Sequence, residues 1–238
     1  MIYITGDTHI PIDINKIDTN AMLNNPRLTK DDYLIICGDF GLVWDWRGES
    51  TLEEMWKKRL SEKPFTTLFV DGNHENFDRL NSLKTELWHG GKVNYITDSI
   101  IHLKRGQVFD ICDKKIFTFG GARSHDRGPA VGNTKEVEGF YWWPEELPSI
   151  EEMDEGRNNL AINDWKVDYV ITHEIHHYGL ESLMLKTGVP FRQDFFNSYL
   201  EDLRIKLVYD KWFCGHYHVN SQITPDTQVL FDDIVKVC

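Results

Sequence analysis

Short apolar runs that each end in glycine and metal-binding side chains constrain the fold of this chain most strongly. Three of them lie in the first third of the sequence, at residues 2–5, 33–37 and 65–70. The polar residues that follow include Asp7, Asp39 and Asn73, at intervals of 32 and 34 residues. Such intervals suit βαβ units, whose crossover helix returns the chain to the same edge of a parallel sheet. The spacing therefore predicts an α/β fold in which these side chains gather where the strands end, the usual place for a ligand.

Two apolar runs in the second half of the chain end in the same way. Residues 167–171 lead into His173, and residues 207–213 lead into a segment that contains His216 and His218. A single histidine after a strand is more often a packed or solvated residue than a ligand. Five successive strand ends with such residues are hard to attribute to turn chemistry, so we expect them to form one site.

The side chains at these strand ends suit divalent cations. Asp7 and His9 are two residues apart, so on an extended backbone they project to the same side and can reach one ion. Aspartate and asparagine oxygens with neutral imidazole nitrogens form a mixed hard and borderline ligand set, which suits Mn, Fe, Zn or Mg. None of the four cysteines falls among them. Because the ligands outnumber the needs of one ion, we expect two ions that share a carboxylate.

The remaining pattern predicts helices and further strands around this framework. Helices are expected at residues 14–24, 51–60, 150–163 and 194–206. Short β-type runs divided by turn residues predict a meander and a closing hairpin, at residues 93–96, 100–103, 107–111, 115–119 and 222–234. Several of the eight tryptophans adjoin charged residues, as in Trp44-Asp45-Trp46, which is more typical of a cleft rim than of a uniform core.

A long irregular segment at about residues 120–149 interrupts the regular pattern. Its length and its content of glycine and tryptophan favour a lid or a substrate wall, although a functionally neutral insertion is the alternative. Arg123 and Arg127 lie in it, and a guanidinium group matches a phosphate with two parallel hydrogen bonds. We expect these arginines either to bind substrate phosphate or to pair with nearby acids such as Glu145 and Glu146.

Composition limits the class of protein. The 238 residues suffice for one domain, residues 1–238, and no run of apolar residues is long enough to cross a bilayer. The chain starts with a strand pattern rather than a secretory signal, and its cysteines form no C-x-x-C pair, so we expect a cytoplasmic protein. Its net charge of −12 opposes stable binding of duplex nucleic acid. A phosphate substrate remains compatible, because bound divalent cations reverse the local charge.

Taken together, the strand-end motifs resemble those of the calcineurin-like metallophosphoesterases. They comprise D-x-H at Asp7 and His9, G-D at Asp39, G-N-H-E at residues 72–75, a lone His173, and G-H-x-H at residues 215–218. Each motif is weak alone, but the full set runs in the order of the family from residue 7 to residue 218. The resemblance implies a four-layer α/β/β/α sandwich, in which helices flank two mixed β-sheets and the metals lie at the C-terminal ends of strands.

The resemblance also implies a role for each residue of the set. One ion would be held by Asp7, His9, Asp39 and His218. The other would be held by Asp39, Asn73, His173 and His216. His74 would assist the leaving group, after attack on a phosphate ester by a hydroxide that bridges the ions. We therefore expect a hydrolase that acts on phosphoric ester bonds, with Mn²⁺ as the first choice of metal and Fe, Zn or Mg as alternatives.

Two departures separate this chain from the Ser/Thr protein phosphatases of the superfamily. Those enzymes resemble the patterns G-D-x-V-D-R-G and R-G-N-H-E, whereas here Leu42 and Val43 follow the second motif and Asp71 precedes Gly72. A close relationship to them is therefore doubtful, and the choice between monoester and diester stays open. A metal-bearing interaction module without turnover and a nuclease of the same superfamily are the alternatives. Glu75 is expected to support the site, by its charge at the start of the next helix.

Overall fold

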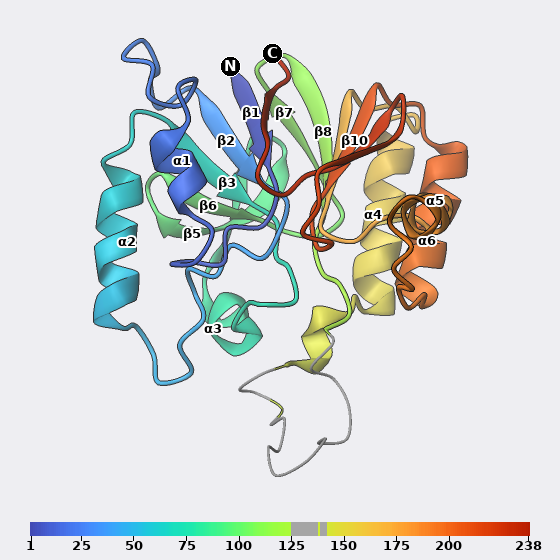
Figure 1. Cartoon of the computed structure of the whole chain (residues 1–238), viewed down its shortest axis with the longest axis horizontal. Coiled ribbons are helices and arrows are strands. Elements are labelled where there is room, and N and C mark those ends of the chain that lie inside the picture. Colours follow the sequence, from blue (N-terminus) through green and yellow to red (C-terminus); the bar gives the residue numbers. More distant parts are fainter. Residues whose placement is uncertain (125–137, 139–141) are drawn as a thin grey trace.

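Two β-sheets pack face to face, and helices cover both outer faces. The computed structural model describes residues 1–124, 138 and 142–238. In Figure 1, α1 and α2 lie against one sheet and α4, α5 and α6 lie against the other. Both sheets contain parallel and antiparallel pairs of strands. The four-layer α/β/β/α sandwich of two mixed sheets is therefore confirmed.

The first sheet has seven strands in the order β13-β1-β2-β3-β6-β5-β4. Its four central strands are parallel, and they are β1 (Ile2–Thr5), β2 (Tyr33–Ile36), β3 (Thr66–Phe69) and β6 (Ile100–Leu103). Antiparallel strands close its two ends, and they are β4 (Thr85–Trp88), β5 (Gly91–Thr97) and β13 (Ile234–Lys236). The parallel register brings the C-terminal ends of β1, β2 and β3 to one edge of the sheet.

The second sheet has six strands in the order β11-β12-β10-β9-β8-β7. The parallel strands are β8 (Lys114–Phe119), β9 (Tyr169–Thr172), β10 (Lys211–Cys214) and β12 (Thr227–Val229). The antiparallel strands are β7 (Gln107–Ile111) and β11 (Ser221–Thr224). The expected closing hairpin is present as β11 and β12, while β13 crosses to the first sheet.

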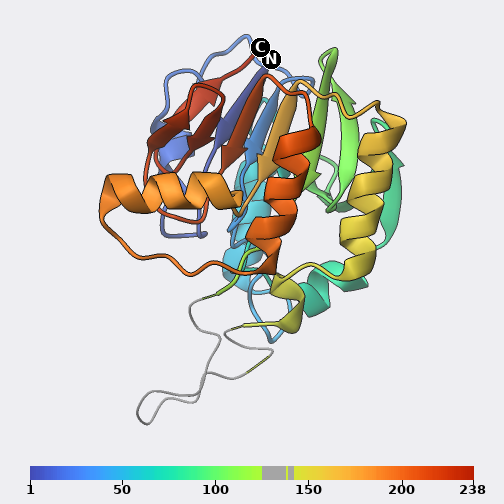
Figure 2. The ribbon, with the colours of Figure 1, turned by 90° about the vertical axis from the view of Figure 1, so that its right-hand side faces the viewer.

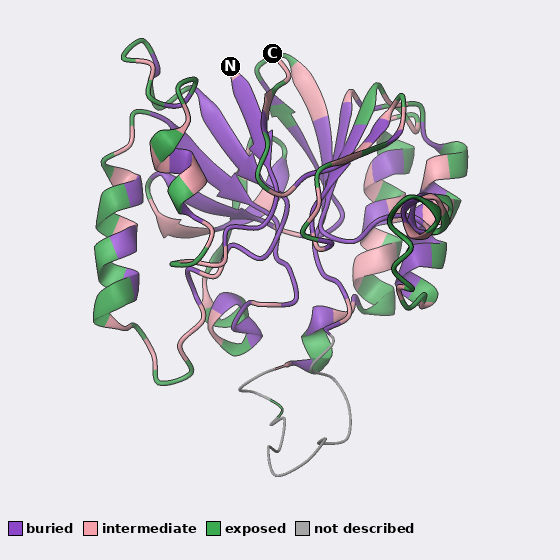
Figure 3. Cartoon of the chain, in the orientation of Figure 1, coloured by how far each residue is buried: buried purple, intermediate pink, exposed green. Residues whose placement is uncertain are grey.

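The strands alternate their side chains between two apolar layers, as a sheet buried on both faces requires. Along β2, Tyr33 and Ile35 pack into the core between the sheets, whereas Leu34 and Ile36 pack beneath the helices. Figure 3 shows the central strands largely buried, the edge strands partly exposed, and the helices exposed along one side. This packing on both faces holds the strand ends rigidly.

The helices differ in length and in how they begin. On the first sheet lie α1 (Asn15–Thr19), α2 (Thr51–Ser61) and α3 (Phe77–Ser82), and on the second lie α4 (Ile150–Ile162), α5 (His177–Thr187) and α6 (Phe195–Lys206). A short 3-10 turn, η1 (Pro144–Glu146), precedes α4. The Ser50 and Ser149 side chains cap α2 and α4, accepting from backbone amides three residues later. Figure 2 shows α4 and α6 running along the second sheet, and α5 beside α6 in a crosswise orientation.

Some boundaries differ from the prediction. The helix expected at 14–24 is limited to Asn15–Thr19, because the Asn20 side chain accepts from the amides of Met22 and Leu23 in a turn. The strand expected at 207–213 begins only at Lys211. The helices α3 and α5 and the exposed edge strand β4 had no clear sequence pattern. Within the described ranges, each helix is too short or too polar to span a bilayer.

Candidate metal centre

Five parallel strands deliver the predicted residues to one place between the two sheets. In the first sheet, β1, β2 and β3 are neighbours, and their ends carry Asp7, Asp39 and Asn73. In the second sheet, β9 and β10 are neighbours, and their ends carry His173 and His216. The convergence follows directly from the parallel pairing within each sheet and the face-to-face packing between them.

The ligand atoms fall into two groups that share one residue. Within each group, all ligand atoms lie within 4.8 Å of one another. The first group contains Asp7, His9, Asp39 and His218. The second group contains Asp39, His173 and His216. Asn73 adjoins the second group, because its Oδ1 lies 3.3 Å from Nε2 of His173. Asp39 therefore stands between the groups, where one carboxylate can reach two ions.

The orientation of the histidine rings is fixed by hydrogen bonds on their outer nitrogens. Nδ1 of His9 donates to the Asp13 carboxylate at 2.9 Å, and Nδ1 of His173 donates to the Cys37 carbonyl at 2.7 Å. Nε2 of each ring then lies 3.3 Å from an Asp39 carboxylate oxygen. Metal-binding histidines are held in this way, with one nitrogen anchored and the other directed at the ion.

Four residues of the two groups have backbone angles that non-glycine residues rarely adopt. The φ angles are 33° for His9, 47° for Asp39, 72° for His216 and 49° for His218. Such angles cost roughly 1–3 kcal/mol each and persist at sites where the surrounding structure enforces them. Their concentration at the ends of β1, β2 and β10 indicates that the ligand geometry is maintained at some expense of stability.

The glycines of the motifs allow side chains of the site to lie directly against the backbone. A Cβ atom at Gly72 would overlap the Asp39 carboxylate, and one at Gly215 would overlap the Asp7 carboxylate. A Cβ atom at Gly38 would overlap the His173 ring. Each position thus requires glycine, because a side chain from a different strand end occupies the place of a Cβ atom.

The electrostatics of the cluster call for a cation. Burial alone would lower the pKa of His173, but the Asp39 carboxylate outweighs this and raises it to about 10. Burial would raise the pKa of Asp39, but His173 and His9 hold it well below its usual range. Two buried carboxylates, Asp7 and Asp39, are surrounded by imidazoles whose inner nitrogens face acceptor oxygens. This donor set fits divalent cations of the hard to borderline class.

His74 lies at the edge of the cluster. Its backbone amide donates to Oδ1 of Asp39 at 2.8 Å, and its ring centroid lies 5.6 Å from that of His9 and 5.5 Å from that of Trp44. The next residue, Glu75, directly precedes Asn76, which is the N-cap of α3. The Glu75 carboxyl group accepts from the amide of Phe40 at 2.8 Å. It therefore supports the loop that carries Asp39.

Asp71, which stands where the protein phosphatases have arginine, belongs to a buried ion pair. Its carboxylate accepts from Nε of Arg105 at 2.8 Å and lies 3.1 Å from Nε2 of His102. Arg105 also donates to the carbonyl oxygen of Glu145 at 2.8 Å. The carboxylate of Glu146 accepts at 3.1 Å from the amides of Ser124 and of Trp143. This network fastens the segments on either side of residues 125–141 to the end of β3.

The predicted phosphate-binding arginines have different outcomes. Arg123 lines a cavity of about 110 Å³ together with Arg192 and with His216, a ligand of the second group. Arg127 lies outside the described residues. Glu146, one proposed partner for these arginines, is engaged with backbone amides. Sequence reasoning missed Arg192, which follows α5 in a loop without a recognisable motif.

Other supporting residues had weak sequence signals. Asp13 lies four residues after His9 and could have been suspected as its partner, whereas the Cys37 carbonyl could not. Nζ of Lys16 donates to the carbonyl oxygen of Asp7 at 2.6 Å, and burial lowers its pKa. Of the tryptophans, Trp46 is 55% exposed and Trp143 is buried, so only part of the expected cleft rim is present.

Comparison with known families is consistent with this geometry. The sequence pattern of the family described as calcineurin-like phosphoesterase matches residues 1–220, which include every predicted metal ligand. That match covers most of the chain and all five strand ends.

Curated relatives carry the name lariat debranching enzyme. Lariat debranching enzyme A of Xenopus laevis is 24% identical over 92% of this chain and 42% of its own length. The human lariat debranching enzyme is 26% identical over 79% of this chain and 36% of its own length. The Danio rerio lariat debranching enzyme is 27% identical over 87% of this chain and 38% of its own length. The chain thus spans about two fifths of the length of these relatives.

Proposed function

The chain belongs to the calcineurin-like phosphoesterase family, and we propose that it is a dinuclear-metal phosphodiesterase. The observation that carries the proposal is the place of Asp39 in both groups of ligand atoms. A carboxylate shared in this way can hold two ions close together, as in hydrolases that clamp a phosphate between two ions.

Each ion would have four protein ligands. The first would be held by Asp7, His9, Asp39 and His218, and the second by Asp39, Asn73, His173 and His216. We propose Mn²⁺ as the metal, with Fe, Zn or Mg as alternatives, because neither group contains a thiol among its described ligand atoms. When bound, such ions supply a water of lowered pKa and neutralise charge on the phosphate oxygens.

His74 would act on the leaving group. Its ring lies beside His9 at the edge of the cluster, and its amide is tied to Asp39, so its position is coupled to the shared carboxylate. A protonated imidazole there can donate to the departing oxygen, a contribution of about 10²–10⁴ in rate. An interaction module would have no use for this histidine, which favours the enzyme.

A phosphodiester is the substrate that we favour. The relatives are named for debranching lariats, a reaction that breaks a phosphodiester bond. The position equivalent to the phosphatase arginine is Asp71, whose charge is paired with Arg105. Arg123 would contact the phosphate from the side of His216. The net charge of −12 still disfavours binding of a duplex, so a nucleic-acid substrate would be single-stranded or branched.

We further propose that the protein works in a reducing, cytosolic environment. All four of its cysteines are free thiols, and Cys37 and Cys214 are buried near the ligands. Burial raises the pKa of both thiols, which keeps them in the protonated, unreactive form.

A panel of metals and substrates tests the proposed function. Protein loaded with Mn²⁺ should hydrolyse bis(p-nitrophenyl) phosphate in preference to p-nitrophenyl phosphate. Asp39→Asn should abolish this activity, because it weakens both groups of ligands at once. A lack of turnover on any phosphoester with any of the four metals would overturn the proposal, and a strong preference for the monoester would overturn the choice of diester.

A further inference from the structure

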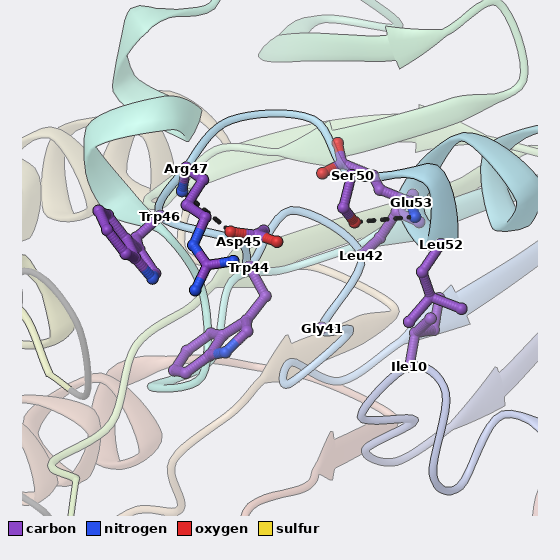
Figure 4. Close-up of a pocket in the computed structure, with 10 residues that line it drawn as sticks. All are labelled: Ile10, Gly41, Leu42, Trp44, Asp45, Trp46, Arg47, Ser50, Leu52 and Glu53. Atoms are coloured by element: carbon purple, nitrogen blue, oxygen red, sulfur yellow. Dashed lines mark hydrogen bonds between the residues drawn. The ribbon is translucent and has the colours of Figure 1, made fainter.

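A pocket of about 300 Å³ lies next to the metal ligands and belongs to none of the roles described above. Figure 4 shows Trp44, Trp46 and Arg47 on one side of it, with Ser50 and Leu52 on the other. Its volume is at the lower end of the range of small-molecule sites, about 300–1,000 Å³. It is therefore large enough for one planar ring system rather than for a long chain.

The lining of the pocket adjoins the first group of ligands. Two residues of its lining, Ile10 and Gly41, lie beside the ligands His9 and Asp39 in the sequence. They are also adjacent in space, because a Cβ atom at Gly41 would lie 3.1 Å from Cα of His9. The Trp44 ring, on the other wall, is 5.5 Å from that of His74. The pocket thus lies on the side of the first ligand group that carries His74.

The walls offer the surfaces that bind nucleobases. The guanidinium of Arg47 lies 5.1 Å from the centroid of the Trp46 ring, and 55% of that tryptophan is exposed. Tryptophan and arginine planes stack on bases without regard to sequence. The one strongly buried acid in the lining, Glu53, is neutralised by Arg79 and Lys57 at 2.8 Å each, so it would not repel a nucleotide.

The loop that carries these walls is fixed to the segment that carries His74. The amide of Asn76 donates to the carbonyl of Val43 at 2.9 Å, and Arg79 donates to the carbonyl of Asp45 at 3.2 Å. The amide of Arg47 donates to the Asp45 carboxylate at 2.9 Å. The stacking surface and His74 are thus held at a fixed separation, as a binding site that positions a leaving group requires.

We propose that this pocket binds the nucleobase of the leaving nucleoside, stacked on Trp46 and Arg47. This assignment rests on the proposed phosphodiesterase function and names its substrate as a nucleoside ester. We assign the pocket to the leaving nucleoside because His74, the proposed leaving-group residue, lies between the shared carboxylate and Trp44.

Binding of a fluorescent nucleoside tests the pocket without turnover. 2-Aminopurine riboside should bind the Asp39→Asn protein with quenching of its fluorescence. Trp46→Ala in that background should weaken binding about tenfold or more, the loss expected for one stacked base, while Trp46→Phe should keep most of it. Trp165→Ala is the matched control, because Trp165 also carries a cation, Lys206, 5.4 Å from its ring centroid. Equal binding by the Trp46→Ala variant and its parent, or no binding by either, would overturn the inference.

Kinetics then separate this inference from the proposed function. Two dinucleoside monophosphates, one complete and one without the base of the leaving nucleoside, are hydrolysed with Mn²⁺. The ratio of their kcat/KM values should fall about tenfold or more in Trp46→Ala and stay constant in Trp165→Ala. An unchanged ratio with normal turnover refutes the inference alone. No turnover of either substrate, with base binding that depends on Trp46, refutes the proposed function and leaves a nucleobase site.

Discussion

The substitution Gly72→Ala should disable the site although it replaces none of the ligand residues. The added Cβ would lie 2.0 Å from Oδ1, 2.3 Å from the backbone nitrogen and 2.7 Å from Cγ of Asp39, whereas an ordinary contact between carbon atoms is about 3.5–4.0 Å. The shared carboxylate and the backbone of Asp39 must therefore move by about 1 Å, and the hydrogen bond that the carboxylate accepts from the amide of His74 must change with them. A displacement of about 1 Å in a catalytic group can cost about 10²-fold in rate, or about 2.7 kcal/mol.

The assay is kcat/KM for bis(p-nitrophenyl) phosphate at saturating Mn²⁺, with bound metal measured in parallel. We expect a loss of about 10²-fold and weaker retention of metal, while the free energy of unfolding falls by about 1–3 kcal/mol from overpacking. The variant therefore stays folded at 25 °C if the parent has ordinary stability.

Gly188→Ala is the matched control. Gly188 ends α5 with a φ of 72°, and a Cβ atom there meets no atom within 4 Å. This change carries the backbone cost of a positive φ, about 1 kcal/mol, and should leave kcat/KM within about twofold. If Gly72→Ala also stayed within about twofold, the position of the Asp39 carboxylate would not govern the reaction, and the reasoning would be refuted.

Three further predictions concern the leaving group, the metal and the pH dependence of stability. His74→Ala should lower kcat by about 10²–10⁴-fold with bound metal unchanged, and a loss of metal instead would make His74 a ligand. Removal of metal with EDTA should abolish activity and lower the Tm by several degrees, because a ligand at 100 times its Kd adds about 2.7 kcal/mol to the free energy of unfolding. An unchanged Tm would contradict a metal site in the folded protein. Burial lowers the pKa of His176 to about 4, so the unfolded chain takes up a proton that the folded chain refuses as pH falls from about 6.5 towards 4. The free energy of unfolding should therefore fall by about 2 kcal/mol between pH 6.5 and pH 5 through this residue. The variant His176→Asn keeps an N-cap side chain for α5, and its free energy of unfolding in urea should lack this part of the pH dependence. An equal pH dependence in the variant and the parent would contradict the assignment to His176.

The sequence predicted those parts of the fold that depend on local pattern. The strands that end at Asp7, Asp39 and Asn73 are short, apolar and followed by glycine. They could therefore be identified as strands whose ends meet at one edge of a sheet. β4 could not, because it is an exposed edge strand without an alternating apolar face. α5 was missed because its N-cap is His176, a residue that rarely marks a helix start.

Contacts between distant segments limit how much of the site could be predicted from the sequence. The ligand set could be grouped from its motifs, but the hydrogen bond from His173 to the Cys37 carbonyl joins residues 136 positions apart. The ion pair between Asp71 and Arg105 spans 34 positions and depends on the packing of β3 beside β6. Neither residue pair has a local pattern that names its partner, so only the folded structure reveals them.

Anomalous diffraction from crystals grown with Mn²⁺ tests the central claim most directly. The account predicts two anomalous peaks on either side of the Asp39 carboxylate, one near His9 and His218 and the other near His173 and His216. A single peak, or two peaks that do not share Asp39, would contradict it.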